Sequence, residues 1–442
     1  MDANNHGCTE PGLGQIEILK KPDYIPKYLE NVTLAYQIKG RLDVDALHAA
    51  FDVISRRHEE IRVTFRGNEG GDFSRFVREP LARYHFVPES PERDSTTARD
   101  SEWVAAEIRR EAFNPIELSV GPILRYRLIP ISRDSEWLLL VTVHHIVFDG
   151  WSKTVFQREI SEAYGALIKD HQPEFPKLAR SYHDCVTVQR RKWERGGFQV
   201  HEDYWRETFA SLCFPLSMPW GRDRPTAFSF RGDQFEFSIE SHRSAIDAFS
   251  RANSCSSNYL LLAAFFVLFE RRTGQRDICI RSPMANRKNS SREGIVGYFV
   301  QPGAYRVVLN AGVTYVDVVR RLNRSSLDVW ANAELPPQFF EACAGVTAGR
   351  SYVSPFQLHF NYQPFSPDLL RLDGVDVRKL GVPLQGVKTD LSLSISQGEK
   401  SLSGAFGYYS GIFRPSDMEI LASDYLKIIE EMIANPEKAV VE

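Results

Sequence analysis

Two adjacent histidines, His144 and His145, stand at the end of an apolar run and are followed closely by Asp149 and Gly150. Imidazole can accept or donate a proton near neutral pH, so each histidine is a candidate for acid–base chemistry. Asp149 could orient such a site by pairing with a cation. Gly150 would let a substrate approach the backbone closely and would offer an N–H group to a developing negative charge. These residue types therefore suit a proton-transfer site.

The elements around these residues are predicted to be a strand followed by a helix. The run 137–143 is apolar and partly β-branched, which indicates a buried strand. Apolar side chains recur at helical spacing over 155–167, so we expect a helix with one buried face and with Ser152 as its N-cap. Because neighbouring side chains on a strand point to opposite faces, His144 and His145 should differ in role. One should face a cavity and the other the packed interior.

Two other interpretations also fit the histidine pair. A His-His-x-x-x-Asp string could bind a metal, but only one of two adjacent strand residues would share a face with the next ligand. No other group of His, Cys and Asp has metal-ligand spacing, so we expect no metal. Hydrogen-bonded core histidines with no chemical role are an equal alternative on these residues alone.

Length and composition restrict the class of protein. The chain has 442 residues, 43% of them hydrophobic and 25% charged, as is typical of a globular protein. A net charge of −3 gives no support for nucleic-acid binding. The longest apolar run, 259–269, is too short to span a bilayer, and the N-terminal residues lack a signal pattern. The six cysteines show no CxxC spacing. We therefore expect a cytoplasmic protein without metal, membrane or nucleic acid.

Predicted strands and helices alternate over both halves of the chain, which favours two α/β lobes. Pro173 and Pro176 interrupt the pattern after the first helix-rich half. We therefore place the lobe boundary there, with an N-terminal lobe over residues 1–175 and a C-terminal lobe over residues 176–442.

The segment 144–152 resembles the HHxxxDG signature of condensation domains of non-ribosomal peptide synthetases, in the chloramphenicol-acetyltransferase-like superfamily. The resemblance extends over essentially the whole chain. It departs at Gln301-Pro302, where the family has Asn-Thr, it is weak around residues 332–336, and it lacks the family's acidic residue near residues 350–352. Further matching residues are Arg57, His58, Glu59, Ile61, Arg62 and Phe65 in the family's second motif, Tyr182, Asp184 and Gln189 in its fourth, and Gly297, Phe299 and Arg306 in its fifth.

This resemblance implies an α/β fold of two acetyltransferase-like lobes in a V-shaped pseudo-dimer. The motif would lie in the N-terminal lobe. Crossover segments of the C-terminal lobe would reach the N-terminal lobe, and a tunnel would run along the interface.

The resemblance also assigns roles to individual residues. His145 would be the catalytic histidine, and the Gly150 N–H would help to stabilise the tetrahedral oxyanion. Asp149 would form a salt bridge with Arg287. Structural support of the site would come from His144, Asp149, Arg287 and Trp151, and bracing of the motif from Arg57, His58 and Arg62.

The implied activity is amide or ester bond formation between a carrier-bound acyl or peptidyl thioester and an aminoacyl or related nucleophile. No intrinsic cofactor is expected, because both substrates arrive on the phosphopantetheine of donor and acceptor peptidyl carrier proteins. Adenylation domains are further expected partners. The protein would be a monomer or part of a multidomain synthetase. Two alternatives are a coenzyme A-dependent acyltransferase acting on a soluble alcohol or amine, and a catalytically silent scaffold of the same fold.

Overall fold

The structure is a computed structural model that describes residues 8–80, 101–132, 135–212, 216–218, 222–345, 356–364, 370–398 and 401–441. The chain forms two compact units. The first consists of Met1–Gly196, Arg287–Val300 and Pro367–Gln385, and the second consists of Gly197–Asn286, Gln301–Ser366 and Gly386–Glu442. Two segments from the second half of the chain therefore complete the first unit, as expected of crossover segments.

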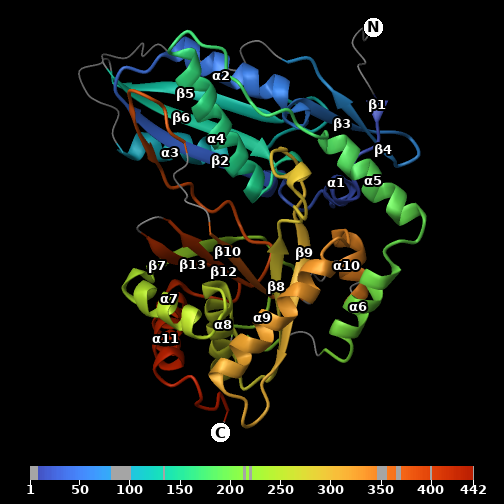
Figure 1. The fold of residues 1–442 in the computed structure, drawn as a ribbon, viewed down its shortest axis with the longest axis vertical. Coiled ribbons are helices and arrows are strands. Elements are labelled where there is room, and N and C mark those ends of the chain that lie inside the picture. The colour runs from blue at the N-terminus through green and yellow to red at the C-terminus, as the bar shows by residue number, and fades with distance from the viewer. Residues whose placement is uncertain are drawn as a thin grey trace. The chain divides into compact units, whose positions relative to one another are not determined.

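A four-stranded antiparallel sheet of order β11-β2-β6-β5 forms the centre of the first unit (Figure 1). Helices α2 and α4 cover one of its faces, and α3 lies on the other. The bounds are β2 (Asn31–Lys39), β5 (Leu124–Ser132), β6 (Glu136–His144), β11 (Asp376–Lys379), α2 (Val44–Arg57), α3 (Ser101–Phe113) and α4 (Gly150–Leu167). The remaining elements are a three-stranded sheet of β1 (Cys8–Thr9), β4 (Phe73–Val77) and β3 (Val63–Gly67), and the helices α1 (Leu13–Leu19) and α5 (Tyr182–Glu194).

Strand β6 is apolar from Trp137 to Val141 because both of its faces are covered. Leu139 and Val141 pack into the cluster under α2 and α4, whereas Leu138 and Leu140 pack into a smaller cluster with Ile108 of α3. This double burial explains the unbroken run that predicted the strand. Helix α4 buries its expected apolar positions against the same sheet.

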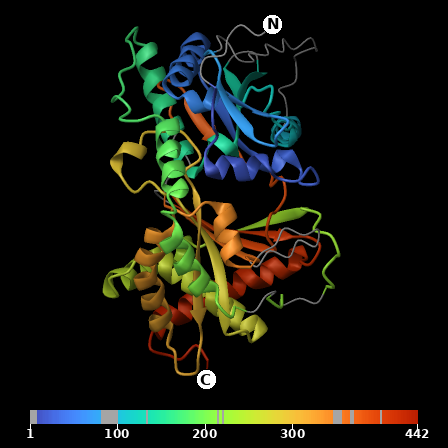
Figure 2. The same cartoon turned by 90° about the vertical axis from the view of Figure 1, so that its right-hand side faces the viewer.

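The second unit contains a six-stranded sheet of order β7-β13-β12-β10-β8-β9. Helices α7, α8, α9 and α11 pack on one of its faces (Figures 1 and 2). The strands are β7 (Gly232–Ser238), β8 (Asp277–Met284), β9 (Gln301–Val308), β10 (Leu358–Gln363), β12 (Leu391–Gln397) and β13 (Leu402–Tyr409). The helices are α6 (Gln199–Phe209), α7 (Arg243–Ala252), α8 (Ser257–Thr273), α9 (Tyr315–Asn332), α10 (Pro337–Cys343) and α11 (Pro415–Ala434).

Helix α8 contains the longest apolar run and is buried from Leu260 to Glu270 within the second unit. No described helix taken alone is long and apolar enough to cross a membrane. A bent pair, Glu240–Ala252 with Ser257–Thr273, meets that requirement by length and composition only.

The first unit extends to Gly196 rather than ending near residue 175. The two prolines end regular structure, but helix α5 beyond them still packs in the first unit. Its Tyr182 hydroxyl donates to the carbonyl of Tyr298 at 3.0 Å, and Arg190 donates to the carbonyl of Pro11. The boundary therefore depends on contacts between residues far apart in the sequence, and the two prolines do not indicate these contacts.

Candidate active site

The histidine pair lies in a tight turn between β6 and α4. Strand β6 ends at His144, and residues His145–Val147 form a short 3₁₀ helix, so the expectation that both histidines lie on the strand was wrong. The expected N-cap was also wrong. Asp149 caps α4, because its Oδ1 accepts the Ser152 N–H at 2.7 Å. Ser152 is then the third residue of the helix, and its hydroxyl can contact another segment.

His145 has a defined tautomer. Its Nδ1 lies 2.6 Å from the carbonyl oxygen of Phe148. A carbonyl can only accept, so Nδ1 must carry the hydrogen, and in the neutral ring the lone pair is on Nε2. The ring is partly exposed and meets the Tyr298 ring edge-on, with the centroids 5.3 Å apart. In this tautomer the neutral ring can accept a proton at Nε2.

His144 has the opposite tautomer and a different environment. It is only 3% exposed, and its Nδ1 accepts the backbone N–H of Ile146 at 3.1 Å. The proton of the neutral ring is therefore on Nε2. This hydrogen bond holds the 3₁₀ turn that follows the strand, which is a structural task.

A buried ion pair fixes the start of α4 to the segment 287–300. Arg287 Nη2 lies 3.1 Å from Asp149 Oδ1, and the two side chains are 1% and 2% exposed. Asp149 Oδ2 also accepts the backbone N–H of Phe299 at 3.0 Å. Burial lowers the pKa of Arg287, while the Asp149 carboxylate opposes that effect. Asp149 therefore caps the helix and binds the crossover segment at the same time.

Arg287 and Ser152 extend this clamp. The Arg287 guanidinium donates to the carbonyl of Ile295 at 2.7 Å and to Ser152 Oγ at 3.0 Å. Ser152 Oγ also donates to the Gly297 carbonyl at 2.8 Å and lies 3.0 Å from the Gly297 N–H. Trp151 Nε1 donates to the carbonyl of Glu293 at 2.8 Å. The residues on both sides of Gly150 thus bind one segment.

Arg57 and His58, at the C-terminal end of α2, contact the helix α4 that follows the motif, whereas Arg62 does not reach it. Arg57 Nε lies 3.1 Å from Glu159 of α4, and His58 Nε2 lies 2.7 Å from the same carboxylate. His58 Nδ1 accepts the N–H of Val296 at 3.4 Å. Arg62 donates instead to the carbonyls of Ser55 and Arg78.

Other residues support the motif from positions that no local pattern marks. Gln15 donates to the carbonyl of Ile146 at 3.0 Å and to the carboxylate of Glu60 at 3.2 Å. Burial raises the pKa of Glu60, and its buried partner Arg75 counters the shift. Partners of this kind lie far apart in the sequence, so only a match of Gln15 to a family motif could have indicated them.

Gly150 is exposed, and a Cβ built on it would meet no atom within 4 Å. Its N–H is the first donor of α4, where helical hydrogen bonding leaves N–H groups unsatisfied. Gly297 is the opposite case, because a Cβ there would lie 2.2 Å from the Tyr182 ring. Protein packing thus requires glycine at 297, whereas at 150 the surrounding space is open.

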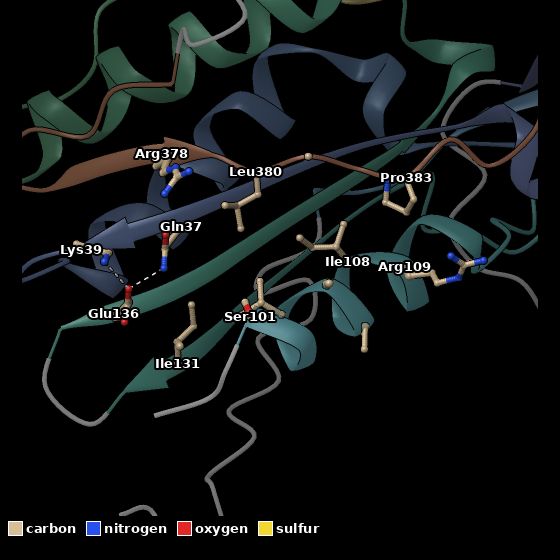
Figure 3. Close-up of a pocket in the computed structure, with 14 residues that line it drawn as sticks. Gln37, Lys39, Ser101, Ile108, Arg109, Ile131, Glu136, Arg378, Leu380 and Pro383 are labelled. Atoms are coloured by element: carbon tan, nitrogen blue, oxygen red, sulfur yellow. Dashed lines mark hydrogen bonds and ion pairs between the residues drawn. The ribbon is translucent and has the colours of Figure 1, made fainter. Parts of the chain in front are cut away.

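The described residues contain no group of three or more His, Cys, Asp or Glu side chains that could hold a metal ion. A cavity of about 810 Å³ lies at the other end of β6 (Figure 3). It lies between α3 and residues 378–383, where Glu136 pairs with Lys39 at 3.0 Å. The motif residues do not line this cavity, so it is separate from the histidine site.

Comparison with known proteins identifies the class. The family model of the condensation domain matches residues 27–442, and the chain belongs to this family. Among curated relatives, chondramide synthase of Chondromyces crocatus is 29% identical over 92% of the chain, and malpibaldin synthetase of Mortierella alpina is 27% identical over 91%. The chain spans only 10% and 7% of the lengths of these two proteins.

Solved structures confirm the fold. The X-domain from teicoplanin biosynthesis matches with a TM-score of 0.84 at 20% identity, covering 99% of this chain and 98% of that one. The condensation domain from Monacolin K polyketide synthase MokA matches with a TM-score of 0.83 at 18% identity, covering 98% and 99%. The resemblance predicted from the motifs and the acetyltransferase-like α/β class are therefore confirmed.

Proposed function

We propose that the chain forms an amide or ester bond by transferring an acyl or peptidyl group from a carrier-bound thioester to an aminoacyl or related acceptor. The observation that carries this proposal is the tautomer of His145. The Phe148 carbonyl binds Nδ1–H at 2.6 Å, so the lone pair of the neutral ring is on Nε2. A base in this orientation suits a nucleophile that must lose a proton as it attacks.

The proposed reaction has two bond changes. The acceptor nitrogen or oxygen attacks the thioester carbonyl and transfers a proton to His145 Nε2. The tetrahedral intermediate then collapses, the C–S bond breaks, and the leaving thiolate takes up the proton that His145 accepted. An amine with a pKa near ~8 is partly neutral at working pH, so His145 also contributes by orienting the nucleophile. The Gly150 N–H, at the positive end of α4, suits the developing oxyanion.

The other motif residues would act by position. Asp149, Arg287, Ser152 and Trp151 bind the first turn of α4 to the segment 287–300. Arg57 and His58 hold α4 through Glu159, which lies near the middle of that helix. A rigid helix start keeps the Gly150 N–H in a constant place, and such preorganisation is what oxyanion stabilisation requires.

The proposed partners are donor and acceptor carrier proteins with phosphopantetheine arms, together with adenylation domains. The support is that the curated relatives are synthases and synthetases many times longer than this chain. The activity needs no resident cofactor, because the thioester is already activated. A coenzyme A-dependent acyltransferase and a silent scaffold are the competing functions.

A condensation assay tests the proposal. A donor carrier loaded with an acyl thioester is offered to free and to carrier-bound amines, and products are identified by mass spectrometry. His145→Ala should lower turnover by roughly 10²-fold or more, while His171→Ala, at an exposed histidine, serves as the matched control. Equal turnover with acyl-coenzyme A would favour the soluble acyltransferase. Carrier binding without any product would favour the scaffold.

A further inference from the structure

Lys153 lies on the same face of α4 as Gly150, three residues further along the helix. Side chains on an α-helix lean toward its N-terminus, so the Lys153 side chain leaves the helix toward the Gly150 end. The space beside Gly150 is open, since no atom lies within 4 Å of a Cβ built there. Lys153 is therefore a cation close to the proposed reaction site.

This lysine is partly buried and has no acidic partner among the described residues. Two deeply buried cations of the first unit are paired with carboxylates, Arg287 with Asp149 and Arg75 with Glu60. Near the other end of the same helix, Lys169 pairs with Asp373 at 3.0 Å. Burial lowers the pKa of Lys153 to about 8, and the nearby charge of Lys379 contributes to that shift. An unpaired charge in such a place is costly and calls for a function.

The neighbouring cation, Lys379, is brought there by the crossover strand. It is the last residue of β11 and lies directly opposite Tyr36 of β2. The Tyr36 hydroxyl accepts a hydrogen bond from Gln157, one turn after Lys153 on α4. The α4 face that carries Lys153 and Gln157 therefore packs over the edge of the sheet where Lys379 sits. Two lysines face one region, and no described carboxylate balances them.

We propose that Lys153 and Lys379 form an anion-binding site that takes a carboxylate carried by one of the two condensing substrates. The inference rests on the proposed function and adds a substrate class to it, namely a dicarboxylic acyl donor or an acceptor with an acidic side chain. An anion offsets the cost of the unpaired lysine on binding, so an acidic substrate gains more than its neutral counterpart.

The test compares matched substrates. In one arm the donor carrier bears glutaryl or pentanoyl thioester with a glycyl acceptor. In the other arm the acceptor is glutamyl or norvalyl with a pentanoyl donor. In one of the arms, wild type should prefer the acidic substrate by about tenfold or more in kcat/KM. Lys153→Met should reduce that ratio to near one, and Lys169→Met should keep it.

Three results would overturn the inference. They are a wild type with no acid preference in either arm, a Lys153→Met variant that keeps the preference, and a Lys153→Met variant that slows acidic and neutral substrates alike. The last result would assign Lys153 to the phosphate of the phosphopantetheine arm, which the acidic and neutral carrier-bound substrates share.

A binding experiment separates this inference from the proposed function. Calorimetry measures the affinity of glutaryl-pantetheine and of pentanoyl-pantetheine without any acceptor, for wild type and Lys153→Met. If no substrate pair gives product but Lys153→Met weakens only glutaryl-pantetheine, the proposed function fails and the anion site stands. If products form without acid preference and the two affinities are equal, the anion site alone fails. A thermal melt checks that Lys153→Met is folded. We expect it to be, because the substitution removes an unpaired charge.

Discussion

Asp149 and Arg287 are 138 positions apart in the sequence, and their side chains meet at 3.1 Å with almost no exposure to solvent. This pair joins the start of α4 to a segment of the second half of the chain. Two backbone N–H groups, of Ser152 and Phe299, also bind the Asp149 carboxylate. The pair is thus the point at which the motif and the crossover segment become one structure.

We expect Arg287→Met to destabilise the first unit by about 3 kcal/mol, because it leaves a buried carboxylate without its cation. Denaturant unfolding measures the change. The double variant Asp149→Asn with Arg287→Met should lose less than the sum of the single variants. Additive losses would show that the two side chains do not interact, and Arg371→Met, at an exposed position, controls for loss of an arginine.

Gly150→Ala and Gly297→Ala should separate activity from stability. At 150 a Cβ meets nothing, so the variant should keep its melting temperature but lose turnover as the methyl group obstructs the approach to the N–H. At 297 a Cβ would lie 2.2 Å from the Tyr182 ring, and we expect a loss of about 1–3 kcal/mol. Thermal melts and single-turnover rates check both variants. Full turnover in Gly150→Ala would contradict its proposed role.

Asparagine substitutions exploit the opposite tautomers of the two histidines. In His145→Asn the side-chain amide can still donate to the Phe148 carbonyl, but the base at Nε2 is gone. We expect an unchanged melting temperature and a turnover lower by about 10²–10⁴-fold. In His144→Asn the amide oxygen can still accept from Ile146 N–H, so most of the activity should remain. Equal losses in the two variants would refute the division of roles.

The stability of the protein should depend on pH through Lys153. Its pKa is about 8 in the folded chain and near ~10.4 in an unfolded one. Between these values the unfolded state binds more protons, so the contribution of Lys153 to stability rises with pH. The melting temperature of Lys153→Met should therefore be higher than that of wild type. The difference should be largest at pH 7 and should shrink from pH 8 to 10. Scanning fluorimetry measures it, with Lys169→Met as control, and a constant difference would contradict the burial of an unpaired ammonium.

Strongly periodic elements could be predicted from the sequence. The strand expected over 137–143 lies within β6 (Glu136–His144), and the helix expected over 155–167 lies within α4 (Gly150–Leu167). Strands β7 and β11 were not predicted. Strand β11 has four mostly exposed residues and exists because it pairs with β2, which no local pattern reveals.

The candidate site could be predicted in part. Local residue types indicated different roles for His144 and His145, and resemblance to a family suggested that Asp149 and Arg287 pair. The strand-face argument for the histidines was wrong because the chain turns immediately after His144. The joint contact of Arg57 and His58 with Glu159 depends on helix packing, so spacing could not predict it.

The crossover strand has a consequence for the order in which the protein folds. Gln385 donates to the carbonyl of Asn31, 354 positions earlier, and β11 supplies an edge strand to β2. Until residues 367–385 have left the ribosome, the first unit lacks both contacts, and the edge of β2 is open to pairing with other chains. The first unit therefore cannot complete its fold during synthesis until residue 385 has been made. A protein cut after residue 196 should fold slowly and tend to aggregate.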